Sequence, residues 1–213
     1  MKRGLILLWA ISLAFAGAAS ASVQQGDAEL NLSGNWSSIN GEDSEQDIDW
    51  LGLSAGFGYF LTDNIQIEAV GTGVWIGDGF QIDETQYLAA DPNWRSTATL
   101  EDARLWSIGA KMKYHFMPTN MWVPYAGALI MWGDLDAEVE ATLEVPAEGV
   151  AEKFNYNLNK DGWILGLLGG MRYELNAYND FYIEYQYKVF EQGLGEVFSD
   201  SHQIWFGILH QFK

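Results

Sequence analysis

The stretch Ile204-Trp205-Phe206-Gly207-Ile208-Leu209-His210-Gln211-Phe212 decides the fold of this chain. Its even-numbered positions carry Ile, Phe, Ile, His and Phe, so one face of an extended chain is largely apolar. A period of two is that of a β-strand, whose side chains point alternately to opposite faces. A tilted strand crosses a bilayer with about 9–11 residues. The stretch therefore predicts a membrane-spanning β-strand.

Further segments repeat this alternation of apolar and polar or small residues. Ala110, Met112 and Tyr114, for example, alternate with Lys111 and Lys113. Such segments predict strands with one lipid-facing side. They are Ala28 to Trp36, Trp50 to Leu61, Ile65 to Ile76, Ala103 to Phe116, Trp163 to Leu175 and Phe181 to Val189.

A fifth strand is expected around residues 123–131. Val123, Tyr125, Leu129 and Met131 are taken as its outer, lipid-facing side. Its other side is apolar as well, so alternation leaves the register of this strand open.

The connections between these strands are of two kinds, which sets the topology. Short turns are predicted at residues 62–64, 117–120 and 176–179, and long acidic loops at 40–49, 77–102, 133–160 and 191–201. An up-and-down barrel in the outer membrane has short periplasmic turns and longer extracellular loops. The predicted fold class is therefore all-β, an eight-stranded antiparallel up-and-down transmembrane β-barrel.

The first residues predict export. Lys2 and Arg3 precede an apolar run from Leu5 to Phe15, and Ala19-Ser20-Ala21 supplies small residues for cleavage. We interpret residues 1–21 as a cleaved signal peptide and 22–213 as one barrel domain with four long extracellular loops. A retained transmembrane helix is the alternative, but the apolar run is shorter than the ~20 residues that a span requires.

Composition narrows the classes of function. The net charge of −18 disfavours nucleic acid as a partner, and the absence of cysteine excludes disulfides and thiolate metal sites. The competing architecture is a soluble lipocalin-like barrel, which would place its apolar faces inside. The glycines and balanced charges on the polar faces favour a membrane barrel instead.

Three segments carry a resemblance to a known family. They are Gly58 to Glu68, Lys113 to Pro118 leading to Val123 to Gly127, and the terminal strand. With these segments the chain resembles the small eight-stranded outer-membrane proteins of the OmpA, OmpX and OmpW kind.

The resemblance implies residence in the outer membrane of a Gram-negative bacterium, a monomeric state, and contact with outer-membrane lipids and lipopolysaccharide. It also implies insertion by the barrel-assembly machinery, which would recognise Gly207, His210 and Phe212 as the assembly signal. Two departures stand out, because Lys213 follows the terminal aromatic and His210 occupies a position that is usually apolar or aromatic.

Charged residues on the inward faces form the first candidate site. Because an eight-stranded barrel has an interior that side chains fill, and buried charges must be paired, we interpret the set as a structural lumen charge network that plugs the barrel. Glu68 and Lys111, on adjacent strands, are expected to pair. A gated conduit for small solutes is the alternative. The set comprises Glu68, Lys111, Lys113, Arg172, Glu174, Glu184 and Lys188.

Catalytic and metal sites find little support in the sequence. Asp200-Ser201-His202 has the residue types of a nucleophilic triad, but consecutive strand residues point apart. Asp134-x-Asp136 and Asp47-x-Asp49 offer oxygen ligands without the spacing of a calcium loop. We therefore expect no catalytic residue, no metal and no cofactor.

The third loop predicts a protruding hairpin. Leu135, Ala137 and Val139 alternate with acidic residues, and Phe154, Tyr156 and Leu158 alternate on the return. Its apolar face either packs on the second loop or leaves an edge that captures an extracellular protein by β-addition.

The function expected of the whole protein is a non-enzymatic structural or surface-interaction role. A narrow channel for small or hydrophobic solutes is the second hypothesis, and lipid A modification is the third.

Overall fold

The structure is a computed structural model, and it describes residues 24–40, 47–76, 80–82, 95–145, 150–198 and 200–212. The predicted signal peptide, residues 1–21, lies outside the described residues. No helix in the described part of the chain has the length and apolar character needed to cross a membrane.

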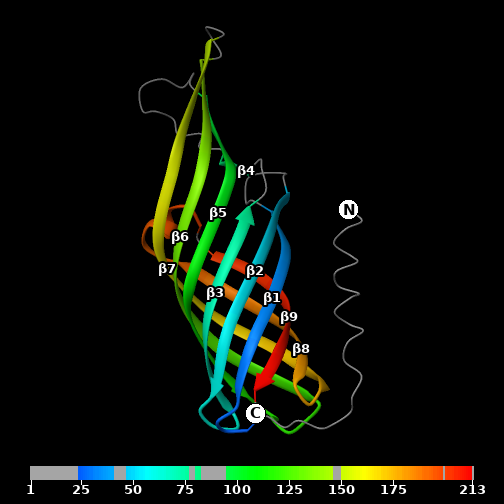
Figure 1. Cartoon of the computed structure of the whole chain (residues 1–213). Coiled ribbons are helices and arrows are strands. Elements are labelled where there is room, and N and C mark those ends of the chain that lie inside the picture. Colours follow the sequence, from blue (N-terminus) through cyan, green and yellow to red (C-terminus); the bar gives the residue numbers. More distant parts are fainter. Residues whose placement is uncertain are drawn as a thin grey trace.

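Eight antiparallel strands form a closed barrel (Figure 1), which confirms the predicted fold class. Neighbours in sequence pair with each other, and the β1–β9 and β3–β5 pairings complete the circle. A short additional strand, β4, pairs with the outer part of β5. The strands are β1 (Ala28–Asn40), β2 (Asp47–Phe60), β3 (Ile65–Ile76), β4 (Phe80–Ile82), β5 (Arg95–His115), β6 (Trp122–Val145), β7 (Val150–Asn176), β8 (Asn179–Phe190) and β9 (Asp200–Phe212).

The side chains of most barrel strands alternate as the sequence predicts. On β5, Ile108 and Met112 are exposed on the outside, whereas Lys111 and Lys113 between and beyond them are buried in the lumen. On β8, Ile183 is exposed and Glu184 is buried. Exposed apolar side chains on the outside of a closed barrel are those that lipid covers.

The predicted outer face of β6 is wrong. Val123, Tyr125, Leu129 and Met131 are all buried inside the barrel, and the exposed residues of this strand include Ala126 and Ile130. The physical reason is that part of the lumen is apolar. A strand with apolar residues on both faces gives no contrast from which its orientation can be inferred.

Strands β5, β6 and β7 continue far beyond the other strands at the loop end of the barrel and form a protruding sheet (Figure 1). The pairing of β6 with β7 runs without interruption from Trp122 and Tyr173 to Val145 and Val150, which confirms the predicted hairpin. Part of the predicted second loop is also strand, because β5 begins at Arg95 and pairs with Glu144 of β6.

An apolar core fills the lumen near the loop end. It includes Leu105, Met131, Leu135 and Ile164, and the fully buried Leu194 contributes from the 3-10 helix η1 (Gln192–Glu196). A Cβ added to Gly133 would lie within 3.0 Å of both Ile164 and Leu194, so these side chains meet over the lumen. The fourth loop thus packs against the side of this core that β6, β7 and β8 form.

Candidate functional site: the charged lumen

The lumen charge network lies between this apolar core and the turn end of the barrel. Six of the seven predicted residues are buried inside, whereas Glu174 is half-buried near the end of β7. Two buried carboxylates, Glu29 and Asp180, were missed by the sequence reasoning. Glu29 was on the polar face of the first predicted strand, so its position gave a signal. Asp180 was missed because the strand predicted from Phe181 to Val189 begins one residue after it.

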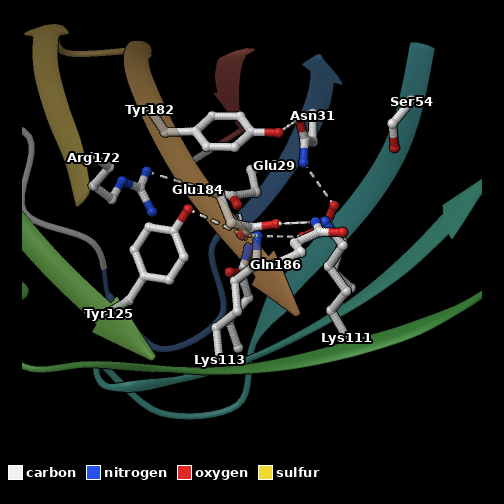
Figure 2. Close-up of polar contacts among 12 residues, drawn as sticks. Glu29, Asn31, Ser54, Lys111, Lys113, Tyr125, Arg172, Tyr182, Glu184 and Gln186 are labelled. Atoms are coloured by element: carbon white, nitrogen blue, oxygen red, sulfur yellow. Dashed lines mark hydrogen bonds and ion pairs between the residues drawn. The ribbon is translucent and has the colours of Figure 1, made fainter. Parts of the chain in front are cut away.

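Glu184 is the centre of the network (Figure 2). Its Oε1 accepts hydrogen bonds from Lys111 Nζ at 2.8 Å and Gln186 Nε2 at 2.5 Å. Its Oε2 accepts one from the Tyr125 hydroxyl at 3.0 Å and lies 3.5 Å from Lys113 Nζ. Hydrogen bonds to all sides offset the loss of hydration that a buried carboxylate suffers.

Lys113 links Glu184 to the opposite wall of the barrel. Its Nζ donates to Glu68 Oε2 at 2.6 Å. The other oxygen of Glu68 accepts from Asn31 Nδ2 at 2.7 Å, and Asn31 Oδ1 accepts from the Tyr182 hydroxyl at 2.8 Å. Side chains from five strands are therefore joined across the lumen (Figure 2).

The expected pairing of Glu68 with Lys111 is wrong. These residues do lie opposite each other in the β3–β5 register. However, the lysine ammonium contacts Glu184 across the lumen, and Glu68 takes Lys113 instead. A long lysine side chain can reach across a narrow barrel. The register between two neighbouring strands therefore does not determine which carboxylate the lysine contacts.

A second cluster surrounds Arg172 nearer the turns. Its guanidinium forms ion pairs with Glu29 at 3.2 Å and with Asp180. Gln66 donates a hydrogen bond to Glu29, and Gln211 Nε2 donates to Asp180 Oδ2 at 2.9 Å. His115 lies alongside, buried in contact with the rings of Phe60 and Tyr125.

The residues considered for catalysis and metal binding are spread apart. Ser201 points into the lumen, whereas Asp200 and His202 are exposed on the outside, so the three do not form a relay. Asp134 and Asp136 are exposed on β6, and the side chain of Asp47 and that of Asp49 lie outside the described residues. The described residues contain no cluster of three or more His, Cys, Asp or Glu placed to hold a metal.

The proposed assembly signal divides between the two faces of β9. Gly207 is buried and pairs with Ser33 of β1, whereas His210 and Phe212 are exposed on the lipid-facing side with their rings 5.0 Å apart. An aromatic residue at this end of the barrel matches the girdle typical of outer-membrane strands.

The outer wall carries a hollow of about 860 Å³. Its floor consists of the small residues Ala55, Gly71 and Gly73, and larger apolar residues border it, among them Leu53, Trp106 and Ile108. Leu53, Trp106 and Ile108 are exposed on the lipid-facing side, whereas Ser54 and Thr72, which also line the hollow, are buried.

A closed antiparallel barrel with apolar outer faces and a charged interior is the architecture of outer-membrane proteins. Residues 10–208 match the model of the outer membrane protein beta-barrel domain family. The chain belongs to this family. Family membership and the lipid-facing apolar surface together place the protein in the outer membrane. No curated protein sequence matches the chain.

Solved structures of small outer-membrane proteins share the fold. Ail, the attachment invasion locus protein of Yersinia pestis, superposes with a TM-score of 0.52 and 10% identity, over 88% of this chain and 99% of Ail. Neisserial surface protein A superposes with a TM-score of 0.50 and 16% identity, over 88% of this chain and 100% of that protein. At such identities the likeness concerns the fold alone.

Proposed function

We propose that this protein is a non-enzymatic surface-interaction protein in the outer membrane of a Gram-negative bacterium, with a lumen closed to solutes. It works as a monomer among outer-membrane lipids and lipopolysaccharide, after insertion by the barrel-assembly machinery. The observation that carries the proposal is the outer part of β7, which among the described residues pairs with a strand on only one side.

The outermost part of β7 has a described strand on only one side. It pairs with β6 from Val150 to Tyr173, but among the described residues it pairs with β8 only from Ile164 toward the turn. The fourth loop packs on β7 next to this point, since Glu191 N donates a hydrogen bond to Trp163 O and Gly193 lies close to Asp161. Among the described residues, no second strand pairs with residues 150–159, which therefore form the edge of the protruding sheet. A free edge presents unpaired backbone N–H and C=O groups that can accept another strand.

The side chains along this edge favour an added strand of a particular composition. Phe154 and Tyr156 are 49% and 50% exposed, opposite Ala141 and Val139 on β6. The other face carries Asp136, Glu138 and Glu140, each in register with an asparagine of β7. An extended segment with alternating apolar and basic residues would meet the aromatic rings on one face and the carboxylates on the other.

The ion pairs and the apolar core support a closed lumen. Lys111, Lys113 and Arg172 are buried and paired with carboxylates, and the buried Leu194 lies near Gly133 at the loop end. Opening a path for solutes would require breaking these pairs, each of which costs about 3–5 kcal/mol when one partner is left uncompensated. The charges therefore favour the surface role over the channel hypothesis.

The test uses the protein in lipid nanodiscs and a fluorescent peptide of alternating valine and lysine. We expect fluorescence anisotropy to detect binding, and Phe154→Ser with Tyr156→Ser to weaken it at least tenfold. Tyr178→Ser is the matched control, because Tyr178 is equally exposed but lies in the turn at the opposite end of the barrel. Equal binding of a proline-interrupted peptide would contradict strand addition. Stepwise conductance in a planar bilayer would contradict the closed lumen.

A further inference from the structure

Among the described residues, one buried ammonium group in the barrel forms no ion pair with a carboxylate. Lys188 on β8 is 4% exposed, and its Nζ donates to Gln203 Oε1 at 2.9 Å. The same oxygen accepts a hydrogen bond from Trp205 Nε1 at 3.1 Å, so one acceptor serves two donors. Among the described residues no ion pair involves Lys188. A buried charge without a counter-charge is strongly unfavourable.

The carboxylates of the lumen are occupied elsewhere. Glu184 accepts from Lys111, Gln186 and Tyr125, and Glu68 accepts from Lys113 and Asn31. Glu29 and Asp180 both serve Arg172. An excess of negative charge thus lies at the Arg172 end. Lys188 is repelled by the ammonium of Lys111 and attracted by the carboxylate of Glu184, which forms no ion pair with it.

A second unsatisfied group lies beside the same tryptophan. Asn35 on β1 is 3% exposed, and neither Oδ1 nor Nδ2 has a hydrogen-bond partner among the described residues. Asn35 is opposite Trp205 in the β1–β9 register. A Cβ added to Gly52 would touch both Asn35 Oδ1 and, at 2.8 Å, Trp205 Cη2, so the amide lies at the tip of the indole. Lys188 Nζ lies 5.4 Å from the centroid of that ring.

We propose that Lys188, Asn35 and Trp205 border a binding site for a small monovalent inorganic anion of the chloride class. The lysine ammonium has three N–H donors and the asparagine amide two, which Gln203 Oε1 cannot satisfy alone. An anion accepts from both groups and compensates the charge of Lys188. Lys188, Asn35 and Trp205 are 4%, 3% and 2% exposed, so a small ion fits this environment better than a large one. This inference is independent of the docking edge on β7.

The direct test is anomalous diffraction from crystals of the whole protein soaked in sodium bromide. We expect a bromide peak within hydrogen-bond reach of Lys188 Nζ, and its loss in Lys188→Met. Lys153→Met is the control, because Lys153 lies exposed on the protruding sheet, and this variant should keep the peak. A water molecule in place of bromide, or a bromide that persists in Lys188→Met, would overturn the proposal.

A solution measurement covers the case in which Lys188→Met does not fold. The thermal midpoint of the wild-type protein in micelles should be higher in sodium chloride than in equimolar sodium gluconate, because an anion that binds only the folded state stabilises it. Asn35→Ser keeps Lys188 but removes amide contacts, and it should reduce this difference. Equal midpoints of the wild-type protein in the two salts would refute an anion site.

Discussion

Replacing Glu184 by glutamine tests whether water is excluded from the lumen charge network. Glu184 is 0% exposed and holds Lys111 at 2.8 Å, the Tyr125 hydroxyl at 3.0 Å and Lys113 at 3.5 Å. The glutamine keeps the size of the side chain but removes its charge. Among the described residues, Lys111 then has no carboxylate in contact, whereas Lys113 keeps its ion pair with Glu68.

The expected magnitude follows from the cost of an uncompensated buried charge. Glu184→Gln should lower the free energy of unfolding by about 3–5 kcal/mol. Lys111→Met in the same protein removes the ammonium that was left unpaired, so the double variant should be more stable than the sum of the single changes predicts. We expect a coupling energy of about 2–3 kcal/mol, at the upper end for contacting pairs.

The assay is equilibrium unfolding in urea within phospholipid vesicles, followed by tryptophan fluorescence. Glu68→Gln combined with Lys111→Met is the matched control, because these residues face each other in the β3–β5 register without an ion pair between them. Its coupling energy should stay below about 1 kcal/mol. Additive effects of Glu184→Gln and Lys111→Met would mean that water solvates each charge separately, and they would favour the channel hypothesis.

Two further predictions test the orientation of the strands. Leu167 is 65% exposed and lies about midway along β7 between the aromatic residues Trp163 and Tyr173. Leu167→Arg should cost about 2–4 kcal/mol in vesicles, whereas Leu61→Arg near the turns should cost about 0–1 kcal/mol, because the penalty falls with distance from the bilayer midplane. Unchanged stability of Leu167→Arg would invert the assigned faces. The chain has no cysteine, so Ala128→Cys should react with an apolar maleimide dissolved in the bilayer, whereas Leu129→Cys, inside the barrel, should not. The reverse pattern would restore the register predicted from the sequence for β6.

Strand orientation could be predicted wherever the two faces differ in polarity. Lys111 and Glu184 each alternate with apolar neighbours, and the structure places both in the lumen. On β6, Tyr125 and Leu129 belong to a face that packs against an apolar part of the lumen, where no contrast exists between interior and lipid. Periodicity then identifies the strand but not the direction in which its residues point.

The partners of the charged residues could not be predicted. Lys111 and Glu184 are 73 residues apart, and their contact spans the barrel from β5 to β8. Such a contact depends on the stagger between strands and on the reach of each side chain, which no local pattern contains. The hairpin of β6 and β7 was predictable because its two arms are consecutive and both alternate.

The distribution of polar groups is the reason for proposing the protruding sheet as the place of recognition. Inside the barrel, Glu184 and Arg172 are engaged with other side chains, and apolar residues such as Leu135 and Ile164 pack toward the loop end. On the barrel wall, apolar residues such as Ile108 face lipid. The backbone of these strands is paired around a closed circle, as a bilayer requires. Residues 150–159 of β7 differ from these strands in two ways. Among the described residues no second strand pairs with them, and they carry the exposed aromatic side chains Phe154 and Tyr156 beyond the part of β7 that pairs with β8. A partner that adds a strand there gains backbone hydrogen bonds without breaking any pair on which the barrel depends.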